Sequence, residues 1–233
     1  RGWFQLSMLP RRIPELPHLE IAAAMKTASE VGGDYYDFQV TEDGALFVAF
    51  GDATGHGLRA GTMVSVIKTL FVTNISHTDE DFDRFFNECT GTIKKIGLGN
   101  LYMALTLLKI DRCKCSLSSA GMPPVFIFRK ENDMVETILL KGPPLGAIKE
   151  FSYHYDYINM DPGDTILLLS DGLAELFNRN DEMFGLERIK EVLKEVGTRS
   201  PGEIISTLDE RAGDWLNYKP LDDDMTFVVI RFI

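Results

Sequence analysis

Short runs of apolar residues recur along the chain at lengths that are typical of β-strands. The turn residues Glu42-Asp43-Gly44 separate two of these runs, which predicts a β-hairpin. The run Thr165–Leu169 is continuously apolar, as expected of a strand that is buried on both faces. From these patterns we expect strands over residues 19–25, 34–40, 45–50, 101–110, 114–119, 125–129, 134–140, 153–160, 165–169 and 225–232.

Other segments carry apolar residues at helical spacing. They predict helices over residues 58–75, 81–96 and 186–196, and from about 200 to 216. We expect Asp79 to cap the second of these helices. The last begins with Ser200-Pro201-Gly202-Glu203, which combines a Ser cap, Pro at the first helical position and Glu at the third. A helix end is expected near residues 3–9, before an arm interrupted by prolines.

The order of these elements indicates the fold class. About ten strands fall in two clusters, and the helices gather after the first hairpin and before the last strand, so the chain does not alternate as a doubly wound fold does. Two packed antiparallel sheets with helices outside, an α+β architecture, explain this order most simply. We expect one domain over residues 19–233. Residues 1–18 would connect it to an upstream segment, since the chain begins at Arg1 and not at Met.

Composition excludes several classes of function. The net charge is -11, and basic residues form only short pairs such as Arg11-Arg12, so a nucleic-acid backbone would be repelled. No apolar run is long enough to cross a bilayer, and we expect no membrane contact by this domain. The 3 cysteines are an odd number without zinc-finger spacing, which fits a reducing, cytoplasmic compartment.

Two aspartates are placed together by the first hairpin. Asp34 and Asp52 each lie nine positions from Asp43 at the centre of the turn, so antiparallel pairing brings them to the same open end. Their even separation also favours the same face of the sheet. The hairpin therefore predicts two neighbouring carboxylates.

Further aspartates stand at the edges of other core strands. Asp171 follows the buried run Thr165–Leu169, and Asp222-Asp223-Asp224 precedes the last strand. Taken singly, each is more often a turn residue than a ligand. A carboxylate at the tip of a buried strand is costly unless it is paired or bound to a metal, however, and hard cations prefer oxygen ligands. Together these positions indicate a metal site.

Several motifs in fixed order give a resemblance to a known family. The chain closely resembles the metal-dependent protein phosphatases, the protein phosphatase 2C-like (PPM) family, and within it the bacterial group with the sporulation protein IIE-type enzymes. The resemblance spans nearly the whole chain. The motifs are Glu30-Val31-Gly32-Gly33-Asp34-Tyr35-Tyr36-Asp37, Gly51-Asp52-Ala53-Thr54-Gly55-His56-Gly57, Ala120-Gly121-Met122-Pro123-Pro124, Gly163-Asp164, Ser170-Asp171-Gly172 and Asp223-Asp224-Met225-Thr226.

The resemblance implies a four-layer α-β-β-α sandwich and two divalent ions, Mn²⁺ or Mg²⁺. Asp52 would bridge the ions. The Ala53 carbonyl and Asp34, which can act through water, would serve one ion, and Asp171 and Asp223 the other. Asp223 is preferred to Asp224 because the family's final ligand lies three residues before the Thr of its motif. A hydroxide between the metals would attack phosphorus without a covalent phosphoenzyme.

The same resemblance implies a substrate and a setting. The enzyme would hydrolyse phosphoserine or phosphothreonine on a protein, expected to be an anti-anti-sigma-type regulator in a partner-switching pathway. An upstream sensor domain in the full-length chain would act through residues 1–20 and the first helices to complete the metal site.

Two positions depart from the family pattern. Met122 stands where the family usually has His. His56 lies in the loop after the bridging ligand but at a shifted spacing, so it is either the acid that protonates the leaving group or a residue that shapes the loop. No upstream Arg matches the phosphate-holding Arg of eukaryotic members.

The same residues are compatible with two other functions. A non-catalytic phosphoprotein-binding regulatory module of the same fold is the main alternative, although such a module is expected to have lost ligands and here none is missing. The segment Gly32-Gly33-Asp34-Tyr35-Tyr36 also resembles the diguanylate cyclase signature, but that interpretation leaves the other acidic motifs unexplained.

Overall fold

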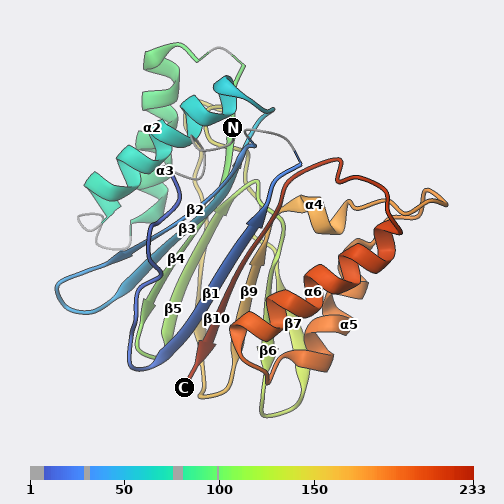
Figure 1. Ribbon diagram of the computed structural model, residues 1–233. Helices are drawn as coiled ribbons and strands as arrows, with labels where there is room; N and C mark the ends of the chain where they lie inside the picture. Colours follow the sequence, from blue (N-terminus) through green and yellow to red (C-terminus); the bar gives the residue numbers. More distant parts are fainter. Residues whose placement is uncertain (1–7, 29–31, 76–80, 99) are drawn as a thin grey trace. The chain divides into compact units, whose positions relative to one another are not determined.

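The computed structural model describes residues 8–28, 32–75, 81–98 and 100–233 (Figure 1). The chain forms two compact units. Unit 1 comprises residues 1–12, 29–122 and 140–159, and unit 2 comprises residues 13–28, 123–139 and 160–233. Each unit contains a five-stranded antiparallel sheet and helices, so the expected α+β class is confirmed.

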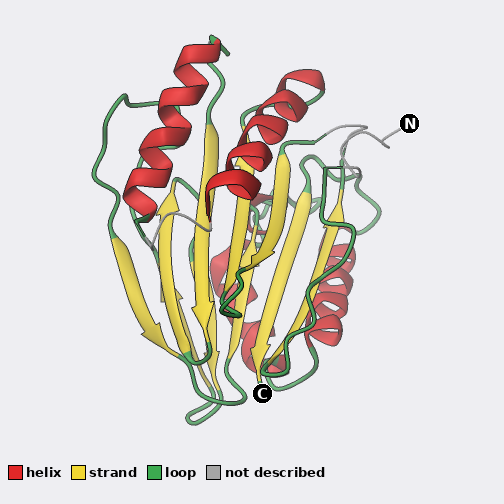
Figure 2. Cartoon of the chain, turned by 90° about the vertical axis from the view of Figure 1, so that its left-hand side faces the viewer, coloured by secondary structure: helices red, strands yellow, loops and turns green. Residues whose placement is uncertain are grey.

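Unit 1 contains the predicted hairpin. Its sheet has the order β2-β3-β4-β5-β8. Two long helices, α2 (Leu58–Asn74) and α3 (Phe82–Ile96), cover one face of this sheet (Figure 2). The strands are β2 (Asp34–Val40), β3 (Leu46–Ala53), β4 (Met103–Asp111), β5 (Lys114–Ala120) and β8 (Tyr155–Asn159).

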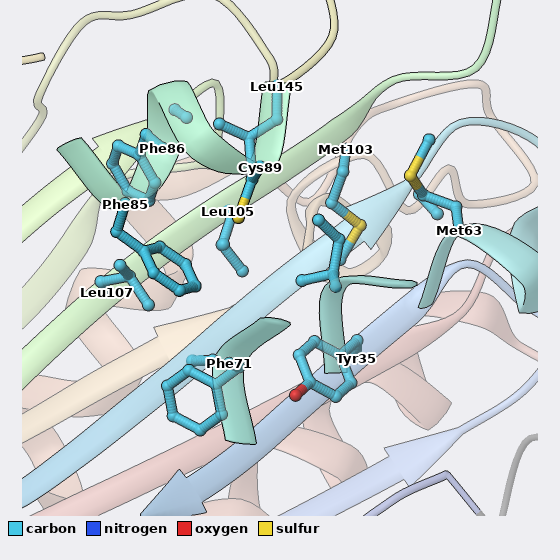
Figure 3. Packing of buried hydrophobic residues seen from close by; sticks show 14 of the residues in the cluster. Tyr35, Met63, Phe71, Phe85, Phe86, Cys89, Met103, Leu105, Leu107 and Leu145 are labelled. Carbon is cyan, nitrogen blue, oxygen red and sulfur yellow. The ribbon is translucent and has the colours of Figure 1, made fainter. Parts of the chain in front are cut away.

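The core of unit 1 lies between this sheet and its two helices. Tyr35 from β2 and Phe71 from α2 are fully buried and point into the same cluster as Phe85 from α3 (Figure 3). Burial of such large side chains is the main source of stability for a unit of this size. The cluster fixes the two helices against the strands that carry the predicted carboxylates.

The N-terminal cap of α3 differs from the prediction. Asp81 is the cap, and its side chain accepts a hydrogen bond from the backbone N–H of Arg84 at 2.9 Å. The predicted cap, Asp79, lies outside the described residues and precedes this position. A cap must stand directly before the first helical residue, and Asp81 meets that requirement.

The strands of unit 2 come from three separate stretches of the chain. Its sheet has the order β1-β10-β9-β6-β7. Its helices are α4 (Asp171–Ala174), α5 (Gly185–Val196) and α6 (Pro201–Leu216). The strands are β1 (Leu19–Lys26), β6 (Val125–Arg129), β7 (Met134–Ile138), β9 (Thr165–Leu169) and β10 (Met225–Phe232).

Helix α6 begins as the sequence predicts. Ser200 and Glu203 form a capping box, in which the Ser200 N–H donates to the Glu203 carboxylate at 3.0 Å. The apolar sides of α5 and α6 bury Leu193, Ile204 and Leu208 against the sheet. All five residues of β9 are buried, as its continuous apolar run indicates.

Several boundaries differ from the predictions. The strand expected over residues 153–160 spans only Tyr155–Asn159, and before its start the backbone N–H of Tyr153 donates to the Asp83 carboxylate at 2.6 Å. The short helix α4 is an addition to the predicted elements. Most of the helix end expected at residues 3–9 lies outside the described residues. Among the helices in the described ranges, none has both the length and the apolar character needed to span a membrane.

Candidate active site

The hairpin of unit 1 places two predicted ligands opposite each other. Asp34 on β2 and Asp52 on β3 are register partners. Residues directly opposite in an antiparallel pair project from the same face, with Cβ atoms about 5 Å apart. Asp34 is 2% exposed, whereas Asp52 is half-buried. The register predicted from the position of the turn is therefore confirmed.

The backbone carbonyl of Ala53 lies beside this pair. The Ala53 N–H donates to the Gly33 carbonyl at 3.0 Å. A Cβ atom on Gly33 would lie 2.3 Å from the Ala53 carbonyl oxygen and 2.4 Å from a carboxylate oxygen of Asp52. Only glycine fits at this position without moving both oxygens. The Gly-Gly-Asp motif thus brings its own backbone against the strand end that carries Asp52.

The loop that follows β3 is fixed at a second point. The Thr54 N–H donates to the Tyr102 carbonyl at 3.0 Å, and the Tyr102 N–H donates to the Thr54 hydroxyl at 3.2 Å. These bonds hold the chain directly after Ala53, before it turns into α2. The oxygens of Asp34, Asp52 and Ala53 therefore stand on backbone that is anchored on both sides.

Unit 2 supplies the second predicted pair of carboxylates. Asp171 is the first residue of α4, and Asp223 lies two residues before β10. Burial raises the pKa of Asp171 above its ordinary value, and the negative charges of Asp223 and Glu175 raise it further. Asp171 and Asp223 are thus close enough for their charges to interact.

Contacts around Ser170 bring the two segments together. The Ser170 N–H donates to the Thr226 carbonyl and the Thr226 N–H to the Ser170 hydroxyl, both at 3.1 Å. A Cβ atom on Gly172 would lie 1.9 Å from the Asp224 carbonyl oxygen. Glycine is therefore required where α4 approaches the residue before β10. This approach explains why Ser170-Asp171-Gly172 and the last aspartates occur as a set.

Adjacent aspartates in the final motif have different environments. Asp224 is buried, and its Oδ1 accepts a hydrogen bond from the Ala28 N–H at 2.8 Å. This bond attaches the chain after β1 to the start of β10. Asp223 is exposed, and its Oδ1 accepts the Asp224 N–H at 2.8 Å. Asp224 thus has a structural partner, while Asp223 has one carboxylate oxygen directed to the backbone.

His56 lies in the exposed loop between β3 and α2. The glycines on either side, Gly55 and Gly57, have φ angles of +83° and +75°. This left-handed backbone is accessible to glycine and strained for most other residues. Met122, at the position where the resembled family usually has His, is buried at 5% exposure.

Two further acidic residues have roles that the sequence does not reveal. Asp37 is buried beside the Lys68 ammonium of α2 and accepts a hydrogen bond from the Tyr35 hydroxyl at 3.1 Å. Asp164 is buried in unit 2, where it accepts from Arg129 at 2.9 Å and from the Lys130 N–H at 3.0 Å. Both are structural, and the cations that pair with them, Lys68 and Arg129, are 31 and 35 positions away in sequence, so no local pattern indicates these pairs.

The donor set suits hard divalent cations. Carboxylate and carbonyl oxygens are the ligands that Mg²⁺ and Mn²⁺ prefer. Within the described ranges, no three His, Cys, Asp or Glu side chains converge on a metal-sized site. Each unit offers one pair of carboxylates, and unit 1 adds the Ala53 carbonyl.

Solved structures with the same fold identify the architecture. The SiaA-PP2C domain of Pseudomonas aeruginosa has a TM-score of 0.84 at 18% identity, covering 100% of this chain and 94% of that one. RsbX, solved in complex with magnesium, has a TM-score of 0.72 at 16% identity, covering 95% of this chain and 99% of that one. At these identities the likeness shows the fold alone.

Sequence relatives indicate the family. RsbU of Bacillus subtilis, named a phosphoserine phosphatase, is 24% identical over 231 residues, which cover 97% of this chain and 67% of that protein. The chain spans between 25% and 67% of the lengths of four curated relatives that it matches. The model of the Stage II sporulation protein E (SpoIIE) family matches residues 42–233. Because this match covers most of the chain, the chain belongs to the SpoIIE family of PP2C-type phosphatase domains.

Proposed function

We propose that this chain is a metal-dependent protein serine/threonine phosphatase. The observation that carries the proposal is the direct pairing of Asp34 with Asp52 beside the anchored carbonyl of Ala53. The electrostatic proximity of Asp171 and Asp223 in unit 2 supports it. Like charges gathered at the ends of strands are unfavourable in a metal-free protein, and a bound cation would reverse that cost.

The ligands proposed for two ions follow the family pattern. Asp52 would bridge them, with Asp34 and the Ala53 carbonyl on one ion and Asp171 and Asp223 on the other. We expect Mn²⁺ or Mg²⁺, because all the donors are oxygens, and RsbX, which has the same fold, was solved with magnesium. When bound, such ions supply an activated water and neutralise charge on the phosphoryl oxygens.

His56 is proposed as the group that protonates the leaving oxygen. Its exposed loop follows Ala53 directly, and two glycines with positive φ angles let the backbone turn sharply there. A poor leaving group such as serine needs an acid, whereas p-nitrophenolate does not. His56→Gln should therefore slow hydrolysis of a phosphoserine peptide at least tenfold more than that of p-nitrophenyl phosphate. His154→Gln, at another exposed His, is the matched control. Equal effects on both substrates would leave His56 as a residue that shapes the loop.

We propose a phosphorylated anti-anti-sigma-type protein as the substrate, in a cytoplasmic partner-switching pathway. RsbU is named a phosphoserine phosphatase, which favours a substrate that carries phosphoserine. The KM for phosphate release should be lower with a serine-phosphorylated anti-anti-sigma protein as substrate than with phosphorylated casein. An equal KM for both proteins would contradict this choice.

Residues 1–18 are proposed to connect the domain at 19–233 to an upstream sensor. Met8 packs against the core of unit 1, and its sulfur accepts a hydrogen bond from Ser65 of α2 at 3.8 Å. Because α2 begins shortly after Ala53, a signal that moves α2 can alter the proposed metal ligands. Removing residues 1–18 should change both activity and Mn²⁺ affinity. If neither changes, the coupling is wrong.

The test of catalysis uses p-nitrophenyl phosphate with Mn²⁺ added. Hydrolysis should require the metal, stop on chelation and fall at least a hundredfold in Asp52→Asn. Asp111→Asn, at an exposed position of β4, makes the same charge change outside the site and should leave the rate unchanged. Hydrolysis that survives both Asp52→Asn and chelation would exclude the mechanism. Binding of a phosphoprotein without any hydrolysis would favour the non-catalytic module.

A further inference from the structure

The loop between α6 and β10 exposes an aromatic side chain to solvent. Tyr218 is 95% exposed, and its φ angle is +69°. The preceding residue, Asn217, also has a positive φ of +46°. Asn217 is the left-handed C-cap of α6, a position that Asn often occupies, whereas a bulky residue such as Tyr218 rarely adopts this backbone. Since Tyr218 buries almost none of its surface in the fold, packing of the fold does not account for its presence.

A second group of exposed apolar residues follows α4. Phe177 and Met183 form a bridge at the base of a short hairpin and are 38% and 48% exposed. The Asn178 side chain accepts from the N–H groups of Asn180 and Glu182 at 2.8 and 3.0 Å. These internal bonds give the hairpin a defined shape without burying its apolar residues.

One side chain joins the hairpin to α6. The indole N–H of Trp215 donates to the carbonyls of Leu176 and Glu182 at 3.2 and 3.3 Å. Trp215 lies in the last turn of α6, three residues before Tyr218. The base of the hairpin and the start of the exposed loop are therefore held at one place. We call Phe177, Met183 and Tyr218 the apolar rim.

The apolar rim is connected along the chain to both carboxylates of unit 2. The hairpin follows α4, whose first residue is Asp171, and the loop of Tyr218 leads to Asp223. Figure 1 shows this loop passing beside α4 on its way to β10, in agreement with the close approach of Gly172 to the Asp224 carbonyl. The rim thus stands on the two segments that carry Asp171 and Asp223.

We propose that the apolar rim is the docking surface for the protein part of the phosphorylated substrate. This inference rests on the proposed function, in which the phosphate binds at metal ions that the carboxylates hold. Exposed aromatic and Met side chains are typical anchors of protein interfaces. A small phosphate ester has no surface to place on the rim, so the rim acts on protein substrates alone.

The test compares phosphorylated casein with p-nitrophenyl phosphate. The double variant Tyr218→Ser/Met183→Ser should raise KM for phosphorylated casein about tenfold while leaving its kcat and the hydrolysis of p-nitrophenyl phosphate unchanged. The matched control is Tyr157→Ser/Met134→Ser, at residues 69% and 55% exposed elsewhere, which should change neither substrate. An unchanged KM for casein, or an equal loss on both substrates, overturns the proposal.

A binding measurement separates this inference from the proposed catalysis. Fluorescence anisotropy with labelled phosphorylated casein should give an affinity that falls about tenfold in the double variant, even if the chain hydrolyses nothing. Absence of hydrolysis with this loss of affinity refutes the phosphatase function and keeps the docking surface. The other possible occupant of the rim is a second copy of this chain, which sedimentation tests. If the double variant turns a dimer into a monomer without changing the affinity for casein, the rim binds a second copy and the proposal is overturned.

Discussion

The backbone N–H of Ala53 donates to the carbonyl of Gly33 at 3.0 Å, and there is no room for a Cβ atom at Gly33. This contact links the strand end that carries Asp52 to the residue before Asp34. The position of the Ala53 carbonyl therefore depends on a residue that has no side chain.

Gly33→Ala should impair the site more than the fold. Its Cβ atom would meet the Ala53 carbonyl oxygen at 2.3 Å, so that oxygen and the Asp52 carboxylate must move. Displacements of about 1 Å at a catalytic group cost on the order of a hundredfold in rate. We expect such a loss in metal-dependent hydrolysis, together with weaker Mn²⁺ binding. Gly91→Ala in α3, where a Cβ atom meets nothing within 4 Å, should retain full activity. Normal activity and Mn²⁺ affinity in Gly33→Ala would show that the carbonyl is not a ligand.

The ion pair between Asp37 and Lys68 should stabilise unit 1 by attaching α2 to β2. Asp37 is almost fully buried, and Lys68→Met would leave its charge without compensation. We expect the free energy of unfolding to fall by about 2–4 kcal/mol, as for other buried pairs that lose one partner. Urea denaturation measures this, with Lys94→Met on the exposed side of α3 as control.

The double variant Asp37→Asn/Lys68→Met isolates the interaction. Removing both charges should recover part of the stability that Lys68→Met loses, because no buried carboxylate is then left alone. Strictly additive losses in the two single variants and the double variant would mean that the pair does not interact.

The neighbours Asp223 and Asp224 should separate activity from stability. Asp224→Ala removes the acceptor of the Ala28 N–H and should lower the free energy of unfolding by about 1–3 kcal/mol. Asp223→Ala should abolish metal-dependent hydrolysis with a smaller loss of stability, since Asp223 is exposed. Thermal denaturation and hydrolysis assays on both variants check this. A reversal of the two effects would assign the ligand role to Asp224.

The raised pKa of Asp171 predicts how stability depends on pH in the absence of metal. A carboxyl whose pKa is higher in the folded chain binds its proton more tightly there. Its contribution to stability is complete below the unfolded pKa of about 4 and is lost as the pH rises through the folded pKa. Asp171→Asn should therefore be more stable than the original chain at pH 7, by an amount that shrinks toward pH 3. A difference that is constant over this range contradicts the prediction.

The local geometry of the hairpin was predictable from the sequence. Counting outward from Asp43 places Asp34 opposite Asp52, and the register confirms it. The capping box of Ser200 and Glu203 was likewise predictable, because four adjacent residues form it. In both cases one short continuous segment, the hairpin or the start of the helix, determines the contact, so the local sequence pattern predicts it.

Partners that are distant in sequence could not be predicted in this way. Asp37 looks like part of the Gly-Gly-Asp motif, yet its partner Lys68 is 31 positions away. The partner of Asp224 is 196 positions away, and nothing local distinguishes it from Asp223. The predicted cap at Asp79 was wrong because helical periodicity locates the body of a helix better than its first residue.

The claim that Asp52 is a shared ligand of two catalytic ions is tested most directly by titrating Mn²⁺ into the metal-free chain while recording both heat and release of phosphate from a phosphoserine peptide. We predict that two ions bind per chain, that phosphate release begins as they bind, and that Asp52→Asn loses both signals while Asp111→Asn keeps them. Two-ion binding with undiminished phosphate release in Asp52→Asn would contradict the account.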